Sequence, residues 1–189
     1  MLVALVGSQG TGKTTVFNKI KEIHPEYQFF TEGVRHQMPA FGYKDPYEIV
    51  DELGIGAFEL MNINSWSVID PKLNTALNLE KNIITDRSAA DNYAYYLCLR
   101  QTPADFASER LLKSMAKYYA SLVDVFVYFP LSTIPLVGDD MRKDSKDHQK
   151  NVDLAILDSF DALKVPKTKI YTLKAVGLED RVKEVLTLF

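Results

Sequence analysis

Short apolar runs alternate along this chain with longer segments in which apolar residues recur at helical spacing. The apolar runs predict five strands, over residues 2–6, 27–30, 82–85, 125–129 and 169–173. The segments between them predict helices over about 12–22, 47–69 in two pieces, 89–100, 103–122, 152–163 and 178–189. This alternation of strands and helices is typical of an α/β domain built on one parallel sheet.

The start of the helix predicted over 103–122 is marked by three residues with helix-starting properties. Thr102 supplies a capping hydroxyl, Pro103 stands where no backbone N–H is needed, and Asp105 places an acid at the positive end of the helix. These three residues predict that the helix begins at Pro103.

Composition and charge narrow the class of protein. The 189 residues are 47% hydrophobic and 25% charged, as in ordinary globular chains, so we expect a single domain over residues 1–189. The first apolar run stops at Gly7, too soon for a signal peptide or a membrane span, and Cys98 is the one cysteine, which favours a reducing cytoplasmic location away from membranes. The net charge of -3 supplies no global attraction to nucleic acid.

The strongest chemical signal follows the first predicted strand directly and opens the first predicted helix. It matches the phosphate-binding pattern GxxxxGK[ST] and consists of Gly7, Ser8, Gln9, Gly10, Thr11, Gly12, Lys13 and Thr14, followed by Thr15. In such a loop the backbone N–H groups surround phosphate oxygens, the lysine reaches the β- and γ-phosphates, and the hydroxyl of the Thr14 position binds Mg²⁺. The sequence therefore predicts a site for ATP and Mg²⁺.

Missing motifs exclude several other classes of P-loop protein. The sequence has no Asn-Lys-x-Asp guanine motif and no Leu-Ser-Gly-Gly transporter signature, and it is too short for the second, helical domain of ring-forming ATPases. A small kinase fits the length.

The third predicted strand ends in an acid and a base. Asp86 and Arg87 stand at the carboxyl edge of the sheet, where ligands of open α/β folds bind. Asp86 is a candidate Mg²⁺ ligand, directly or through water, and Arg87 a candidate to bind a phosphate or the reacting oxygen of the acceptor. The alternative is a structural ion pair between Arg87 and Asp91, one turn along the next helix.

The second predicted strand ends similarly, in Glu32. A carboxylate placed there beside the P-loop can accept the proton of a substrate hydroxyl that attacks the γ-phosphate. The alternative for Glu32 is a solvated loop acid.

A charged segment over about 137–151 follows the fourth predicted strand and is a candidate lid. Its Arg142 or Lys143 would neutralise charge on the transferred phosphoryl group when the lid closes. The alternative is a solvated charged loop. Tyr93, Tyr95 and Tyr96 are expected to be mainly core residues, with stacking on a substrate base as the alternative.

Four blocks together resemble a known family: GSQGTGKTT at 7–15, TEGVR at 31–35, TDRSAADNYAY at 85–95 and GDDMR at 138–142. They are similar to the small P-loop kinases related to the nicotinamide riboside kinase domain of NadR, which include phage nucleotide kinases, and more distantly to the deoxynucleoside kinases. A phage origin would place the protein in the host cytoplasm.

The resemblance implies a sheet order of 2-3-1-4-5, in a three-layer P-loop fold with a short lid. It matches Glu32 to the catalytic base, Arg87 to a cation on the substrate side and Arg142 to a lid arginine. The deoxynucleoside kinases carry a glutamate where this chain has Asp86. The resemblance also places the base-reading loop at residues 175–177.

These observations predict an ATP-dependent kinase that transfers the γ-phosphoryl group to a small nucleoside- or nucleotide-like acceptor. Two alternatives stay open: a phage-type kinase that acts on hydroxymethyluracil in DNA, and a nucleotide-dependent ATPase switch or regulatory module. The sequence leaves open the acceptor, the choice between ATP and GTP, and the formation of a homodimer.

Overall fold

A computed structural model of the chain describes residues 1–31, 33, 38–99, 106–131 and 146–189. Its centre is one five-stranded sheet whose order is β2-β3-β1-β4-β5, with every neighbouring pair parallel. The strands are β1 (Leu2–Val6), β2 (Gln28–Thr31), β3 (Ile83–Asp86), β4 (Val125–Tyr128) and β5 (Ile170–Thr172). All five predicted strands and the predicted order are confirmed.

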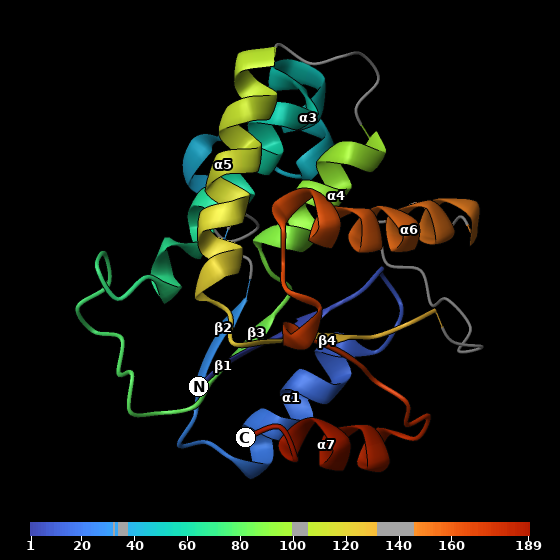
Figure 1. Cartoon of the computed structure of the whole chain (residues 1–189). Coiled ribbons are helices and arrows are strands. Elements are labelled where there is room, and N and C mark those ends of the chain that lie inside the picture. The colour runs from blue at the N-terminus through green and yellow to red at the C-terminus, as the bar shows by residue number, and fades with distance from the viewer. Residues whose placement is uncertain (32, 34–37, 100–105, 132–145) are drawn as a thin grey trace.

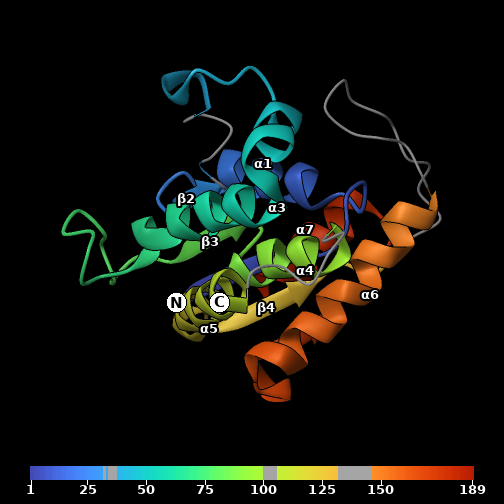
Figure 2. The ribbon, with the colours of Figure 1, turned by 90° about the horizontal axis from the view of Figure 1, so that it is seen from above.

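Helices cover both faces of this sheet (Figure 1). The α-helices are α1 (Lys13–Ile23), α3 (Pro46–Ser65), α4 (Ala89–Leu99), α5 (Phe106–Leu122), α6 (Lys146–Leu163) and α7 (Leu178–Leu186). Short 3₁₀ helices are η1 (Met38–Phe41), η2 (Trp66–Ile69) and η3 (Lys167–Lys169). Helices α1 and α7 lie together on one face, and α3, α4, α5 and α6 lie on the other, an arrangement that can also be followed from above in Figure 2.

The two faces of the sheet bury separate apolar clusters. Val3, Leu5 and Ile84 pack with α1 and α7, whereas Ala4 and Val6, which alternate with them along β1, pack with the helices of the opposite face. Strands buried on both faces read as continuous apolar runs, which is why β1 has no polar position.

The parallel register brings the carboxyl ends of the central strands together. Asp86, the last residue of β3, pairs with Leu5 of β1 on one side and with Thr31 of β2 on the other. Tyr128, at the end of β4, pairs with Val6, the residue that precedes the glycine-rich segment. The glycine-rich segment that follows β1 and the predicted site residue Asp86 at the end of β3 therefore lie at the same edge of the sheet.

The predicted helix boundaries need two corrections. Helix α6 begins at Lys146, six residues before the predicted start, so the last part of the expected lid segment is the beginning of a helix. Its apolar spacing starts only at Val152, with Ile156, Phe160 and Leu163 following, and the polar turns before Val152 carry no such pattern. The last helix ends at Leu186 instead of Phe189.

The other helix predictions agree with the structure where it describes the chain. The two pieces expected over 47–69 are α3 and η2, and α4 ends one residue before the predicted end. The predicted start of α5 at Pro103, with its Thr102 cap, and residues 137–145 of the expected lid lie outside the described residues. None of the helices described is long and apolar enough to cross a membrane.

Candidate functional site

The glycine-rich segment forms a tight loop between β1 and α1, which we call the P-loop (residues 7–14). At Gly7 the backbone φ is +146°, and an added Cβ would lie 2.6 Å from the carbonyl oxygen of Phe129. At Gly12, the residue before α1, φ is +88°. Only glycine takes up such a turn without a steric cost, so the chain can leave a buried strand and begin a helix within a few residues.

Side chains of the P-loop itself stabilise this turn. The Lys13 ammonium donates to the Ser8 carbonyl oxygen at 2.6 Å and to the Thr11 hydroxyl at 3.3 Å. The Thr11 hydroxyl donates to the same carbonyl oxygen at 2.9 Å. The buried Lys13 is thus held against the loop, and its predicted interaction with phosphate oxygens stays a prediction.

Thr14 and Asp86, both predicted as Mg²⁺ ligands, are in direct contact. The Thr14 hydroxyl donates to Asp86 Oδ2 at 2.6 Å. Asp86 is 9% exposed, and its other oxygen, Oδ1, has no hydrogen-bond partner among the described residues. A hydroxyl and a carboxylate beside a P-loop are the oxygen ligands that Mg²⁺ prefers, so these two residues fit the ion.

Asp91 ties the P-loop to the turn after β3. Its side chain is 0% exposed and accepts hydrogen bonds from the Gly7 N–H at 3.1 Å, the Ser88 N–H at 2.9 Å and the Ser88 hydroxyl at 2.8 Å. Burial raises the pKa of Asp91, and the positive charges of Lys13 and Arg87 oppose that rise. The sequence suggested Asp91 only as an ion-pair partner of Arg87, whereas its hydrogen bonds hold the first peptide of the P-loop.

Arg87 adopts a strained backbone conformation at the end of β3. Its φ is +78°, a value that is uncommon for any residue with a side chain, and its N–H donates to the Leu5 carbonyl oxygen at 2.9 Å. The guanidinium carbon lies 5.0 Å from the centre of the Tyr95 ring. Tyr95 in turn donates its hydroxyl to Gln9 Oε1 at 3.0 Å. Arg87 is thus linked to the P-loop through Tyr95.

The three tyrosines of α4 divide between core and site. Tyr93 and Tyr96 are buried and their rings stack at a centroid distance of 6.2 Å, which agrees with their expected core role. Tyr95 is half-buried and contacts the P-loop.

Two further side chains contact P-loop carbonyl groups and were missed in the sequence. Gln149 of α6 donates from Nε2 to the Gln9 carbonyl oxygen at 2.7 Å. Arg181 of α7 donates from Nη1 to the Thr11 carbonyl oxygen at 2.9 Å. A signal for Arg181 does exist, because it stands on the apolar stripe of α7 beside Leu178, Val182 and Val185, where a charged residue is unexpected.

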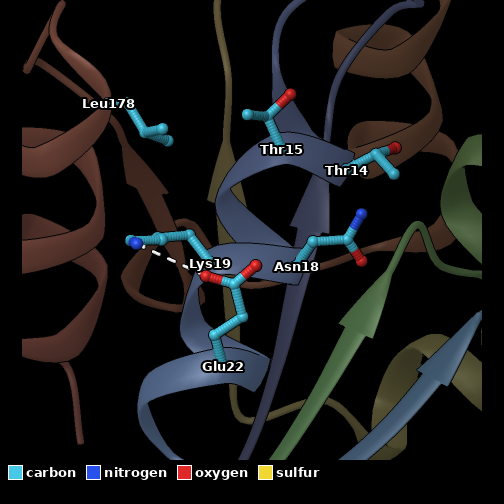
Figure 3. Close-up of a pocket in the computed structure, with 6 residues that line it drawn as sticks. All are labelled: Thr14, Thr15, Asn18, Lys19, Glu22 and Leu178. Carbon is cyan, nitrogen blue, oxygen red and sulfur yellow. Dashed lines mark hydrogen bonds and ion pairs between the residues drawn. The ribbon is translucent and has the colours of Figure 1, made fainter.

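A groove begins at the P-loop threonines and follows the exposed side of α1. Its volume is about 360 Å³, and its walls are Thr14, Thr15, Asn18, Lys19, Glu22 and Leu178. In Figure 3, Lys19 extends toward α7, from which Leu178 projects, and an ion pair of 3.3 Å joins Lys19 to Glu22. The groove lies next to Thr15, the last residue of the predicted phosphate-binding set.

Two predicted catalytic residues lie beyond the part of the chain that the structure describes. They are Glu32 and Arg142, and their roles stay predictions. Gly33, which follows Glu32, donates its N–H to the Ser65 hydroxyl at 3.2 Å, and this contact joins the chain after β2 to the end of α3.

Solved structures with the same fold include several kinases. A NadR protein in complex with NR is 16% identical with a TM-score of 0.69, and the match covers 98% of this chain and 49% of that one, so this chain spans about half of NadR. A deoxyadenosine kinase from M. mycoides is 18% identical with a TM-score of 0.68 and coverage of 100% and 98%. The thymidylate kinase of Candida albicans is 16% identical with a TM-score of 0.66 and coverage of 99% and 89%.

Sequence comparison gives the family. No curated protein matches this chain. Residues 2–181 match the family described as an AAA domain, AAA_28, and this stretch includes the P-loop, Asp86 and Arg181. Because the match extends over nearly the whole chain, the protein belongs to this AAA domain family.

Proposed function

We propose that this protein is a kinase that transfers the γ-phosphoryl group of Mg²⁺-bound ATP to a small nucleoside- or nucleotide-like acceptor. The contact between the Thr14 hydroxyl and Asp86 Oδ2, beside a P-loop, is the observation that carries the proposal. The fold shared with a NadR protein in complex with NR, a deoxyadenosine kinase and a thymidylate kinase supports it, because two of these three proteins are kinases by name. Fold similarity alone leaves the reaction open, so the residues of the site must support it as well.

The P-loop side of the site binds and orients ATP. Backbone N–H groups of the loop and the ammonium of Lys13 surround the β- and γ-phosphates, and Thr14 and Asp86 hold Mg²⁺. When bound, Mg²⁺ neutralises charge on these phosphates. Asp91 keeps the first peptide of the loop in place through its bond to the Gly7 N–H, so little reorganisation is needed when ATP binds.

The transfer itself is a displacement at the γ-phosphorus. The acceptor oxygen forms a bond to phosphorus as the bond to the β,γ-bridging oxygen breaks, and ADP leaves with that electron pair. When the acceptor is a hydroxyl, we assign its proton to the Glu32 carboxylate. Arg87 and Arg142 are proposed to stabilise the charge of the transferred group.

Transfer of labelled γ-phosphate from ATP tests this proposal. The acceptor panel holds ribo- and deoxynucleosides, their monophosphates, nicotinamide riboside, and DNA with and without hydroxymethyluracil, with an acceptor-free control. We expect label on a small molecule with the natural protein and none with Lys13→Ala, since the ammonium that interacts with the γ-phosphate is gone. Lys21→Ala, which changes an exposed lysine of the same helix, is the matched control and should keep full activity.

Other outcomes would replace the proposal. Label on modified DNA alone would favour the phage-type DNA kinase, and phosphate release without any labelled acceptor would favour the ATPase switch. Undiminished transfer by the Lys13→Ala protein would exclude the P-loop mechanism.

Glu32 needs a separate test because the structure does not describe it. Glu32→Gln removes the proton acceptor but keeps the shape of the side chain, so turnover should fall about 10²- to 10⁴-fold while ATP affinity stays nearly constant. A pure loss of ATP binding would assign Glu32 to nucleotide binding instead.

A further inference from the structure

Arg181 is a buried charged residue that joins two loops from opposite ends of the chain. It is 6% exposed, in the second turn of α7. Its Nη1 donates to the Thr11 carbonyl oxygen of the P-loop at 2.9 Å, and its Nε donates to the Ala175 carbonyl oxygen at 3.0 Å. A buried guanidinium is costly unless it is hydrogen-bonded, and these two carbonyl groups give it partners 170 and 6 residues away along the chain.

The bond to Thr11 fixes a peptide that would contact phosphate. In a planar trans peptide the C=O and the following N–H point in opposite directions. Since the Thr11 carbonyl is held toward Arg181, the N–H of Gly12 points away from Arg181. In a phosphate-binding loop the backbone N–H groups face the phosphate, and this bond would fix the orientation of one of them. The guanidinium is packed closely against this peptide, because a Cβ at Gly12 would lie only 2.9 Å from Nη1.

The other partner of Arg181 lies in the loop between β5 and α7, at residues 173–177. Glu184, one turn further along α7, accepts hydrogen bonds from the Lys174 N–H at 3.0 Å and from the Ala175 N–H at 2.7 Å. Ala175 is therefore held at its N–H by Glu184 and at its carbonyl by Arg181. The conformation of this loop is set by two charged side chains of one helix.

We propose that Arg181 is a positioning residue that holds the P-loop and the β5–α7 loop in one fixed arrangement, so that the phosphate-binding N–H groups are oriented before a nucleotide arrives. The proposal rests on the proposed function in one respect, namely that the P-loop binds a nucleoside triphosphate. It goes beyond that function because it attributes part of the affinity of the P-loop for phosphate to a side chain of the last helix that is hydrogen-bonded to the loop backbone.

Binding measurements on Arg181→Met test this role. The methionine keeps an apolar stem of similar reach and removes both donors. We expect the Kd of Mg²⁺-ATP and the Kd of Mg²⁺-tripolyphosphate, measured by calorimetry on the full chain, to rise about tenfold, as expected for the loss of a charged hydrogen bond. Because tripolyphosphate has no base or ribose, a parallel loss would locate the effect at the P-loop.

Controls separate positioning from stability. Lys183→Met removes the same charge from an exposed site on the same helix and should leave both Kd values unchanged. Circular dichroism identifies a temperature at which each variant is folded, and the binding measurements are made there. In NMR spectra, the Gly12 amide resonance should shift less on tripolyphosphate binding in Arg181→Met than in the natural protein. If Arg181→Met does not fold, Arg181→Lys carries the test, since it keeps the charge but lacks the two-donor fork, and its Kd should rise at least threefold.

The outcomes distinguish this inference from the proposed function. A natural protein that binds neither ligand would exclude nucleotide binding and with it both proposals. A natural protein that binds Mg²⁺-ATP, together with a folded Arg181 variant of unchanged Kd and lower melting temperature, would reduce Arg181 to a structural residue and overturn this inference alone.

Discussion

Single side chains of the site acquire their roles from partners that are far away in the sequence. Thr14 is in the first turn of α1, and Asp86 ends β3 72 residues later, yet their side chains are hydrogen-bonded at 2.6 Å. The pairing places a hydroxyl and a carboxylate on one side of the P-loop. Each was predicted as a Mg²⁺ ligand, and their contact is what one ion bound to both, as proposed above, requires.

Asp86→Asn tests that shared ion. The amide keeps the shape and can still accept from Thr14, but it lacks the negative charge, so the Mg²⁺ concentration for half-maximal activity should rise about 10- to 100-fold whether the carboxylate binds the ion directly or through water. Titration of activity with MgCl₂ at saturating ATP measures the change. Asp158→Asn, at an exposed position of α6, is the control. An unchanged Mg²⁺ requirement in Asp86→Asn would remove Asp86 from the metal site.

Three residues whose contacts with the P-loop were not predicted from the sequence share one property. Asp91, Gln149 and Arg181 act on backbone groups of the P-loop that lie 84, 140 and 170 positions away. Almost every peptide group can donate or accept such a bond, so the residue type of the backbone partner does not reveal the contact. The P-loop glycines and Lys13 were identified because their chemistry depends on spacing within a few residues.

At the level of elements, α3 carries a built-in break. Gly54 has φ 82° and ψ 161° inside the helix, a combination that is almost restricted to glycine. The two helical pieces predicted over 47–69 correspond to α3 and η2, so this break inside α3 was not predicted. The break lets the two halves of α3 take different directions over the sheet.

Two glycines of α3 make a matched pair for testing this break. Gly54→Ala should lower the free energy of unfolding by about 1–3 kcal/mol, because alanine is strained at positive φ even though no atom lies within 4 Å of the new methyl. Gly56→Ala should raise it by about 0.5–1 kcal/mol, since Gly56 is helical and an added Cβ would lie at an ordinary 3.8 Å from the Tyr96 ring. Urea unfolding measures both. Equal effects of the two substitutions would contradict the role of Gly54.

The junction between η2 and α5 depends on an ionised acid. Tyr118 donates its hydroxyl to Asp70 Oδ2 at 2.6 Å, and the Lys72 N–H donates to Oδ1 at 2.8 Å. These bonds lower the pKa of Asp70 below its ordinary value, against the effect of burial. The unfolded chain therefore binds a proton more readily at Asp70 than the folded chain does. The stability from Asp70 is present above about pH 4 and is lost as the pH falls through its folded pKa.

Asp70→Asn should reveal this dependence. Above about pH 5 the natural protein should melt at a higher temperature than the variant, and the difference should shrink as the pH falls toward 2. Thermal melting monitored by circular dichroism across that range measures it. A difference that stays constant down to pH 2 would show that ionisation of Asp70 contributes nothing to the junction.

At the scale of the whole molecule, the P-loop is the place where both layers of helices meet. Asp91 of α4 and Gln149 of α6 reach it from one face of the sheet, and Arg181 of α7 reaches it from the other. A ligand that stabilises the P-loop should therefore stabilise the whole fold.

Thermal unfolding with and without nucleotide tests this coupling. Mg²⁺-ATP at about 100 times its Kd should add about 2.7 kcal/mol to the free energy of unfolding, which for a chain of this size raises the Tm by about 5–10 °C. Removal of Mg²⁺ with EDTA should reverse much of the rise, because Thr14 and Asp86 then lose their ion. A Tm that does not respond to Mg²⁺-ATP would contradict nucleotide binding.

Local spacing in the sequence was enough to determine the five strands, the α/β class and the P-loop, because apolar runs, helical periodicity and a glycine pattern are each complete within a few residues. The strand order came from family resemblance and is confirmed by the structure. The early start of α6 and the hydrogen bonds from Asp91, Gln149 and Arg181 were decided only by tertiary structure. The hydrogen bonds depend on which backbone groups packing brings within bonding distance of these side chains, and that proximity is a property of the folded chain alone.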